Sequence, residues 1–209
     1  MKSIFISTML LCALSGFSQN YGNKVDPSKG FIEKLKVAGE KTQSILCSFN
    51  QTKYMAVLTK PNISSGIFYY KKEQNICLEY TLPKGNLIVM SQGKFKIVSE
   101  EKTTILEMKS NPMMQQMGIM LTACMTGDLK LFGSDSQTEY YESKLYYTVI
   151  IMPNDKKLKK YLKQIILKFD KKDMTLETML MKENDTDYTQ YEFKDKKLNS
   201  TIDPDKFKI

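Results

Sequence analysis

Few side chains in this chain of 209 residues could support covalent or metal chemistry. There is no histidine, which excludes Ser-His-Asp and Cys-His catalytic groups and histidine-ligated zinc. The four cysteines are scattered and form no CxxC knuckle, and the phosphate-binding patterns GxGxxG and GxxxxGK[ST] do not occur. The chemistry that remains is the burial of apolar surface. We therefore expect a binding protein rather than an enzyme, with no catalytic residues, cofactor or metal.

Carboxylates and thiols are the other candidates for chemistry. The carboxylate pairs at residues 100–101 and 185–187 lie in expected turns beside lysines, a setting typical of solvated charge. Three cysteines remain once the first 18 residues are set aside, and an odd number gives no disulfide framework. One bridge, such as Cys47–Cys77, would suit an oxidising compartment. Three buried free thiols, Cys124 included, would equally suit the apolar neighbours of each cysteine.

An uncharged segment, SNPMMQQMGIMLTACMTG at residues 110–127, stands out in a chain with 26% charged residues. Asn111 can cap a helix, Pro112 fits its first position and Gly127 can end it in a left-handed conformation. The segment holds five of the 14 methionines, whose soft torsions let a surface re-pack around varied guests. It is too polar and too short to span a membrane. Two interpretations stay open, a buried core helix and a flexible lid over a cavity.

The first 18 residues have the pattern of a cleavable secretory signal peptide. Lys2 supplies the charge, residues 4–14 form the apolar region, and Gly16-Phe17-Ser18 is a small-x-small cleavage site. Cys12 follows a leucine rather than the small residue that a lipid-attachment site requires. We therefore expect a soluble exported protein with one domain at residues 19–209.

The basic character of the chain comes from lysine alone. The formal net charge is +8, and none of the 31 basic residues is arginine. The lysines are dispersed, and the guanidinium groups that read bases and phosphates are missing. We therefore expect no nucleic-acid partner, and the positive charge indicates solubility or attraction to anionic membrane surfaces.

Hydrophobic periodicity predicts two helices and one long antiparallel meander. The first helix spans residues 31–41, after a flexible lead-in at 19–30, and the second is the uncharged segment. Strands are expected at residues 45–50 with an extended continuation at 56–59, and at 64–71, 76–82, 86–90, 94–99, 103–108, 138–142, 145–152, 161–170, 174–182 and 188–194. About eleven strands rarely stay flat in one sheet, so the sheet should curl. A curled sheet with an apolar inner face and a soft helix across its mouth is a container.

Several segments resemble the LolA family of periplasmic lipoprotein carriers in order and spacing. They are ILCSFNQ at 45–51, SSGIFYYKK at 64–72, ICLEY at 76–80, LIVMSQGK at 87–94, DYTQYEF at 187–193, and Leu198-Asn199 followed by Phe207. The resemblance covers nearly the whole chain after residue 18. It implies a mainly β (α+β) fold, an incomplete antiparallel β-barrel whose helices form a lid over a hydrophobic cavity.

The resemblance also implies a function and a location. A LolA-like protein is a monomer in the periplasm of a Gram-negative bacterium and shields the acyl chains of lipoproteins in its cavity. It would take cargo from a LolCDE-type transporter in the inner membrane and pass it to a LolB-like receptor in the outer membrane. The alternative is a sensor of the same superfamily that binds misrouted lipid or lipoprotein. Such sensors carry an extra C-terminal domain, and none fits after Ile209.

The expected cavity lining comes from the sheet and from the helical lid. The acyl-binding candidates are Phe49, Phe68, Tyr70, Leu78, Tyr80 and Met90 from the sheet, and Met113, Met117, Met120, Leu121 and Met125 from the lid. Ordinary core packing is an equal alternative for the sheet residues, since a register slip of one residue would turn them outward. The family commonly has an arginine after the GxFxYK-type strand that links barrel to lid. Lys72 stands there and is the candidate latch, although an ammonium lacks the planar fork.

Overall fold

The computed structural model describes residues 21–26, 30–99, 102–110, 112–129, 136–156 and 158–209. The side chains of Pro112, Met113, Gln116 and Met117 are not among those described. The predicted signal peptide and the predicted helix cap Asn111 therefore lie outside the described residues.

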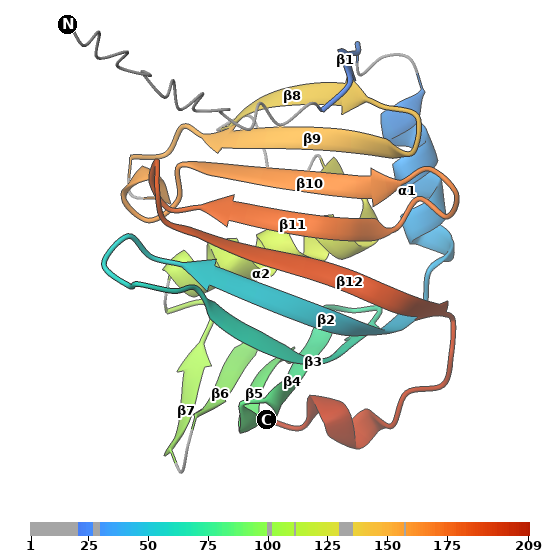
Figure 1. Cartoon of the computed structure of the whole chain (residues 1–209). Helices are drawn as coiled ribbons and strands as arrows, with labels where there is room; N and C mark the ends of the chain where they lie inside the picture. Colours follow the sequence, from blue (N-terminus) through green and yellow to red (C-terminus); the bar gives the residue numbers. More distant parts are fainter. Residues whose placement is uncertain (1–20, 27–29, 100–101, 111, 130–135, 157) are drawn as a thin grey trace, which may run out of the picture.

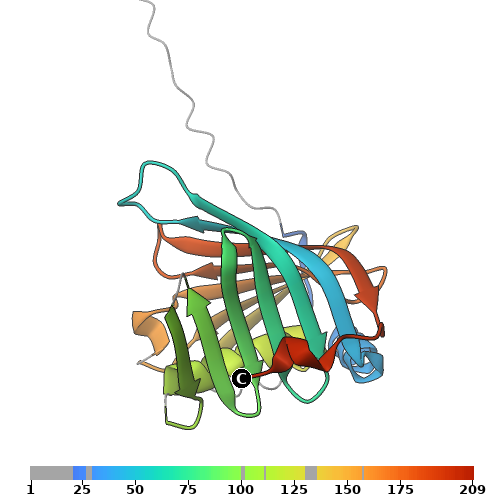
Figure 2. The same ribbon diagram turned by 90° about the horizontal axis from the view of Figure 1, so that it is seen from below.

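One antiparallel sheet of twelve strands makes up most of the described chain (Figure 1). The strands are β1 Asn23–Lys24, β2 Ser44–Tyr54, β3 Asn62–Lys71, β4 Asn75–Leu82, β5 Lys84–Ser91, β6 Lys94–Ser99, β7 Lys102–Glu107, β8 Ser136–Glu142, β9 Tyr146–Pro153, β10 Gln164–Asp170, β11 Leu176–Lys182 and β12 Tyr188–Leu198. Their order in the sheet is β1-β8-β9-β10-β11-β12-β2-β3-β4-β5-β6-β7, so the two halves of the chain join where β12 pairs with β2. The sheet curves strongly without closing, which confirms the predicted incomplete barrel (Figure 2).

Two helices lie on the concave side of the sheet. Helix α1, Phe31–Lys41, has the predicted bounds and buries Phe31 and Leu35, which lie one helical turn apart. Helix α2, Pro112–Thr126, crosses the hollow of the sheet, and Gly127 follows it with a φ of +65°, the predicted left-handed end (Figure 2). Two short 3-10 helices, η3 at Leu158–Lys160 and η4 at Pro204–Phe207, complete the described elements.

Buried apolar side chains form three clusters. The inner core fills the space between the concave face and the helices and consists of Phe31, Leu35, Ile45, Cys47, Phe49, Phe68, Tyr70, Ile76, Leu78, Met90, Phe95, Met108, Met114, Met120, Cys124, Met125, Leu129, Tyr147, Val149, Ile151, Ile165, Leu167, Phe169, Leu176, Met179 and Phe193. The C-terminal cluster consists of Cys77, Val89, Ile202 and Phe207, where η4 packs on the outer face of β4 and β5. The third cluster consists of Ile150, Ile166 and Leu180 on the outer face of β9, β10 and β11. Strands that are apolar on both faces therefore serve separate clusters.

Two sequence expectations about local structure are wrong. Residues 56–59, expected to continue a strand, form a loop, because the amide of Leu58 donates to the carbonyl of Met55 at 2.9 Å and turns the chain. The lead-in at residues 19–30, expected to be flexible, contains β1, in which Asn23 pairs with Glu142. A strand of two residues has no periodicity that a sequence could show.

Candidate functional site

The inner core is where the described lining candidates meet. Phe49, Phe68, Tyr70, Leu78 and Met90 all belong to it, together with Met120 and Met125 from α2. Tyr80 and Leu121 are partly buried and pack against it. Met113 and Met117 lie in α2, but their side chains are outside the described set. The structure thus gathers the described candidates from sheet and helix into one apolar body.

Aromatic rings hold the sheet side of this core. The rings of Phe49 and Tyr80 meet edge to face with centroids 5.2 Å apart, and the Tyr80 hydroxyl donates to the Gln51 side chain at 2.7 Å. The ring centroids of Phe68 and Phe193 lie 5.3 Å apart, and the ring of Tyr191 stacks on that of Phe193, which also belongs to β12. Burial in this group raises the pKa of Tyr191. Sequence reasoning did not select the two β12 aromatics, although their spacing of two residues indicates one face of a strand.

Beside Cys124 and Met125, little space remains between this sheet face and α2. A pocket of about 10 Å³ remains where Cys47, Phe68 and Phe193 face Cys124 and Met125 of α2. That volume holds about one water molecule, whereas ligand pockets typically span roughly 300–1,000 Å³. An acyl chain could enter at this point only if α2 moved or its methionines re-packed.

The three thiols lie on two sides of the sheet. Cys47 and Cys124 line the small inner pocket, whereas Cys77 lies in the C-terminal cluster on the outer face. All three are free, so the alternative of a Cys47–Cys77 bridge does not hold in this structure. Burial raises the pKa of Cys47 and that of Cys77 to about 12, and it also raises the pKa of Cys124. These thiols are therefore packing groups with little nucleophilic character.

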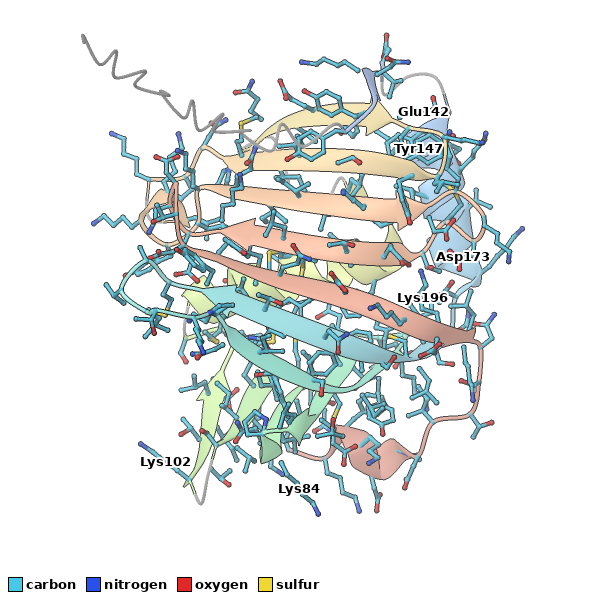
Figure 3. All side chains as sticks on the ribbon, in the orientation of Figure 1. Lys84, Lys102, Glu142, Tyr147, Asp173 and Lys196 are labelled. Carbon is cyan, nitrogen blue, oxygen red and sulfur yellow. The ribbon has the colours of Figure 1, made fainter. Side chains whose placement is uncertain are left out.

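A lysine that sequence reasoning missed borders the same pocket. Lys196 lies in a bulge of β12 together with Asp195, whose φ is +55°, where the pairing with β2 shifts register. Figure 3 labels its side chain. That side chain is only 10% exposed, and its Nζ lies 2.8 Å from Glu177 Oε2. The stem of Lys196 covers the rim of the pocket while its charge is paired.

The predicted latch residue contacts α1 rather than α2. The Nζ of Lys72 donates to the carbonyl oxygen of Glu40 in the last turn of α1, at 3.0 Å. Helix α1 in turn meets the end of α2 backbone to backbone, because a Cβ on Gly39 would lie 1.6 Å from the Thr126 carbonyl oxygen. Gly127 approaches α1 as well, and a Cβ there would lie 2.7 Å from the Leu35 carbonyl oxygen. The link from Lys72 to α2 therefore passes through α1.

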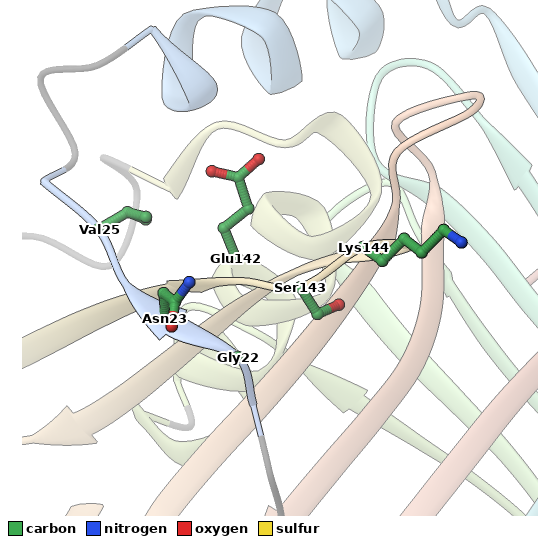
Figure 4. Close-up of a pocket in the computed structure, with 6 residues that line it drawn as sticks. All are labelled: Gly22, Asn23, Val25, Glu142, Ser143 and Lys144. Atoms are coloured by element: carbon green, nitrogen blue, oxygen red, sulfur yellow. The ribbon is translucent and has the colours of Figure 1, made fainter.

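A wider pocket lies at the opposite end of the sheet order from β7 (Figure 4). It measures about 580 Å³ and is lined by Gly22, Asn23, Val25, Glu142, Ser143 and Lys144. Four of its six lining residues have polar or charged side chains, and the ammonium of Lys171 holds the pKa of Glu142 below its usual range. Such a lining does not suit an acyl chain.

The described residues offer neither a metal site nor a membrane-spanning helix. No group of three or more cysteines, aspartates and glutamates in that part of the chain could hold a metal ion. No helix there has the length and apolarity needed to cross a bilayer.

Comparisons with known proteins place the fold. The sequence matches the family described as "Outer membrane lipoprotein carrier protein LolA" over residues 40–209. No curated protein sequence matches the chain at a significant level. Among solved structures, MucB has a TM-score of 0.52 at 12% identity, with 86% of this chain and 61% of MucB covered. An uncharacterized conserved protein from Thermus thermophilus has a TM-score of 0.50 at 6% identity, covering 85% of this chain and 90% of that protein. The lipoprotein LppX of Mycobacterium tuberculosis has a TM-score of 0.47 at 9% identity, with 86% of this chain and 99% of LppX covered.

Proposed function

The chain belongs to the LolA family of outer membrane lipoprotein carrier proteins, and from this premise we propose that it carries lipoproteins between membranes. In this proposal it is a periplasmic monomer, exported by a signal peptide, that binds the acyl chains of lipoproteins between sheet and α2. It receives them from a LolCDE-type transporter in the inner membrane and delivers them to a LolB-like or equivalent receptor in the outer membrane. It catalyses no reaction.

The single observation that carries the proposal is the make-up of the inner core. One wall is the sheet with its aromatic side chains, and the other is a helix whose described core contacts include Met114, Met120 and Met125. Methionine side chains are unbranched and adapt to irregular neighbours. Such a wall can exchange contacts with the sheet for contacts with an acyl chain at little cost in shape complementarity.

The packed state of the core defines how binding must proceed. Because the pocket beside Cys124 holds about 10 Å³, an acyl chain enters there only when α2 moves or its methionines re-pack. Each buried methylene then contributes about 0.8 kcal/mol, and the return of the methionines to the sheet opposes that gain. The closed core therefore competes with the cargo, which allows release at the receptor.

The proposal is tested by titrating the purified protein with a synthetic triacylated lipopeptide. Met120→Glu places a carboxylate in the inner core and should abolish binding while the far-UV dichroism of the sheet stays unchanged. Met152→Glu is the matched control, since Met152 is next to the inner-core residue Ile151 in β9 and so faces outward. Unaltered affinity in the Met120 variant would disprove the assignment of the site.

A second measurement separates the carrier from the sensor of the same superfamily. The loaded protein is mixed with acceptor vesicles that contain a LolB-like receptor. Movement of the lipopeptide to the vesicles supports a carrier. Retention of the lipopeptide on the protein supports a sensor.

A further inference from the structure

The loop between β2 and β3, residues 55–61, presents apolar side chains to water. Val57 is 83% exposed, and Leu58 and the first apolar residue of β3, Ile63, are exposed as well. Figure 2 shows this loop extending beyond the neighbouring strand ends. Single exposed apolar residues are normal on a protein surface. Three of them lie within residues 57–63 of one projecting hairpin, and such a concentration indicates a contact surface.

The hairpin is held in its projecting shape by specific contacts at its base. The amide of Ala56 donates to Asp187 Oδ1 at 2.8 Å, and this hydrogen bond lowers the pKa of the Asp187 carboxyl. The rings of Tyr54 and Tyr188 stack across β2 and β12 with centroids 5.6 Å apart. The apolar tip is therefore fixed outward, although no neighbouring part of the described chain covers it.

Neighbouring loops extend the hairpin into one rim of the molecule. The ion pair between Lys163 and Asp185 joins the loop before β10 to the loop before β12, and Asp187 joins the latter to the hairpin. Figure 1 shows these three loops together at the left end of the sheet. Tyr161 lies in the loop before β10 and is 62% exposed, which adds an amphipathic ring to the rim.

Lysines outnumber carboxylates on the rim. Among the described residues, its three loops and the adjoining ends of β2 and β11 contain more lysines (Lys53, Lys60, Lys156, Lys159, Lys160, Lys163 and Lys182) than carboxylates (Asp155, Glu183, Asp185 and Asp187). Lys60, Lys159 and Lys160 are exposed on it, and none of them forms an ion pair with a described residue. The carboxylates of Asp185 and Asp187 are already engaged, one with Lys163 and the other with the hairpin amide. An apolar tip surrounded by lysines and tyrosines matches the layered chemistry of an anionic bilayer surface.

We propose that this rim docks on anionic phospholipid bilayers, with Val57 and Leu58 entering the headgroup region. The lysines of the rim contact lipid phosphates, and the exposed tyrosine lies at the level of the headgroups. This contact goes beyond carrying acyl chains, because it involves the outer rim and not the inner core. Docking would place this end of the sheet against the donor membrane when cargo is collected and against the acceptor membrane when cargo is delivered.

Vesicle flotation tests the docking directly. The purified protein should float with vesicles of phosphatidylglycerol and phosphatidylcholine and far less with phosphatidylcholine alone. Val57→Asp should lower the partition coefficient about tenfold or more, because an apolar insertion is lost and a negative charge approaches the anionic surface. Leu145→Asp is the matched control: Leu145 is 60% exposed beside a lysine, but it lies in the β8–β9 turn at the other end of the strands. Equal partition of the two variants would overturn the proposal.

Fluorescence locates the contact, since the chain contains no tryptophan. Val57→Trp should show a blue-shifted emission when anionic vesicles are added, and Leu145→Trp should not. An unchanged Val57→Trp spectrum, or an equal shift in both variants, would show that the hairpin does not enter the bilayer.

A third variant separates docking from cargo binding. Met120→Glu alters the inner core only, so it should lose lipopeptide binding yet float with anionic vesicles like the unaltered protein. Flotation that disappears with Met120→Glu would show that the vesicles bind through the inner core, and it would overturn the proposal. Failure of lipopeptide binding alone leaves the docking result standing.

Discussion

Replacing Gly39 with alanine should separate α1 from α2 and loosen α2 on the inner core. A Cβ at this position would lie 1.6 Å from the carbonyl oxygen of Thr126, where ordinary contact begins near 3.4 Å. The two helices must therefore move apart by about 1.8 Å, the difference between these distances. No side chain can turn aside to relieve the contact, because the opposing atoms belong to the backbone of α2.

The size of the effect can be estimated for stability and for thiol reactivity. Overpacking of this kind costs about 1–3 kcal/mol of unfolding free energy, and Tm falls by about 2–4 °C per kcal/mol in a chain of this length. Burial raises the pKa of Cys47 from 9.0 to about 12, so at a pH below both values its thiolate fraction is about a thousandfold smaller than that of an exposed thiol. Water that enters between Cys47 and Cys124 should accelerate the labelling of Cys47 by up to that factor, and it should also accelerate the labelling of Cys124.

The assay follows the labelling of each cysteine with a maleimide by peptide mass spectrometry. Cys77 is an internal control, because η4 and not α2 covers it. Gly93→Ala is the matched variant: it places alanine at a φ of +72° in the β5–β6 turn, where no atom lies within 4 Å of the new Cβ. If Cys47 and Cys124 react no faster in Gly39→Ala than in Gly93→Ala, α1 does not hold α2 on the core. Equal acceleration of Cys77 would indicate general unfolding instead.

Two further predictions concern the outer face of the sheet. Phe207→Ala empties the C-terminal cluster and should cost about 3 kcal/mol, with faster maleimide labelling of Cys77 while Cys124 stays protected; faster labelling of both would contradict separate clusters. Glu79 accepts a hydrogen bond from Lys206 at 2.7 Å, which lowers the pKa of its carboxyl, so the pair stabilises the fold above the ordinary glutamate pKa and loses this effect as pH falls through the lowered value. Because both side chains are partly exposed, Glu79→Gln should cost at most about 1 kcal/mol at neutral pH. Tm measured against pH should show that difference vanish in acid, and a difference that persists there would refute the assignment.

Local chemistry explains which elements could be predicted from the sequence. The bounds of α1 followed from the spacing of Phe31 and Leu35, and the left-handed end of α2 followed from Gly127. Residues 56–59 were wrongly predicted to be extended because an apolar run has the composition of a strand. The base of the loop at residues 55–61 is also held by Asp187, which is more than a hundred residues away in sequence and accepts a hydrogen bond from the Ala56 amide.

The inner core was predictable in kind but not in detail. Phe49, Phe68 and Leu78 share one face because strands alternate, so an alternating pattern identifies candidates once the register is known. Lys196 could not be found in this way, since a bulge in β12 decides which way it points. How tightly α2 packs on the sheet depends on contacts across the whole fold, which no local pattern records.

Because the two edges of the described sheet do not meet, the width of the space on its concave side is not fixed. In a closed β-barrel, the number of strands and the shear fix the radius. In the described chain β1 and β7 each have one neighbour and do not meet, so the arc can unroll through slight changes of twist shared among all its strands. Such widening breaks no ladder of backbone hydrogen bonds. In the proposed carrier, a flatter arc together with movement of α2 would make room for a thicker bundle of acyl chains, so one scaffold could bind lipoproteins with different numbers of chains.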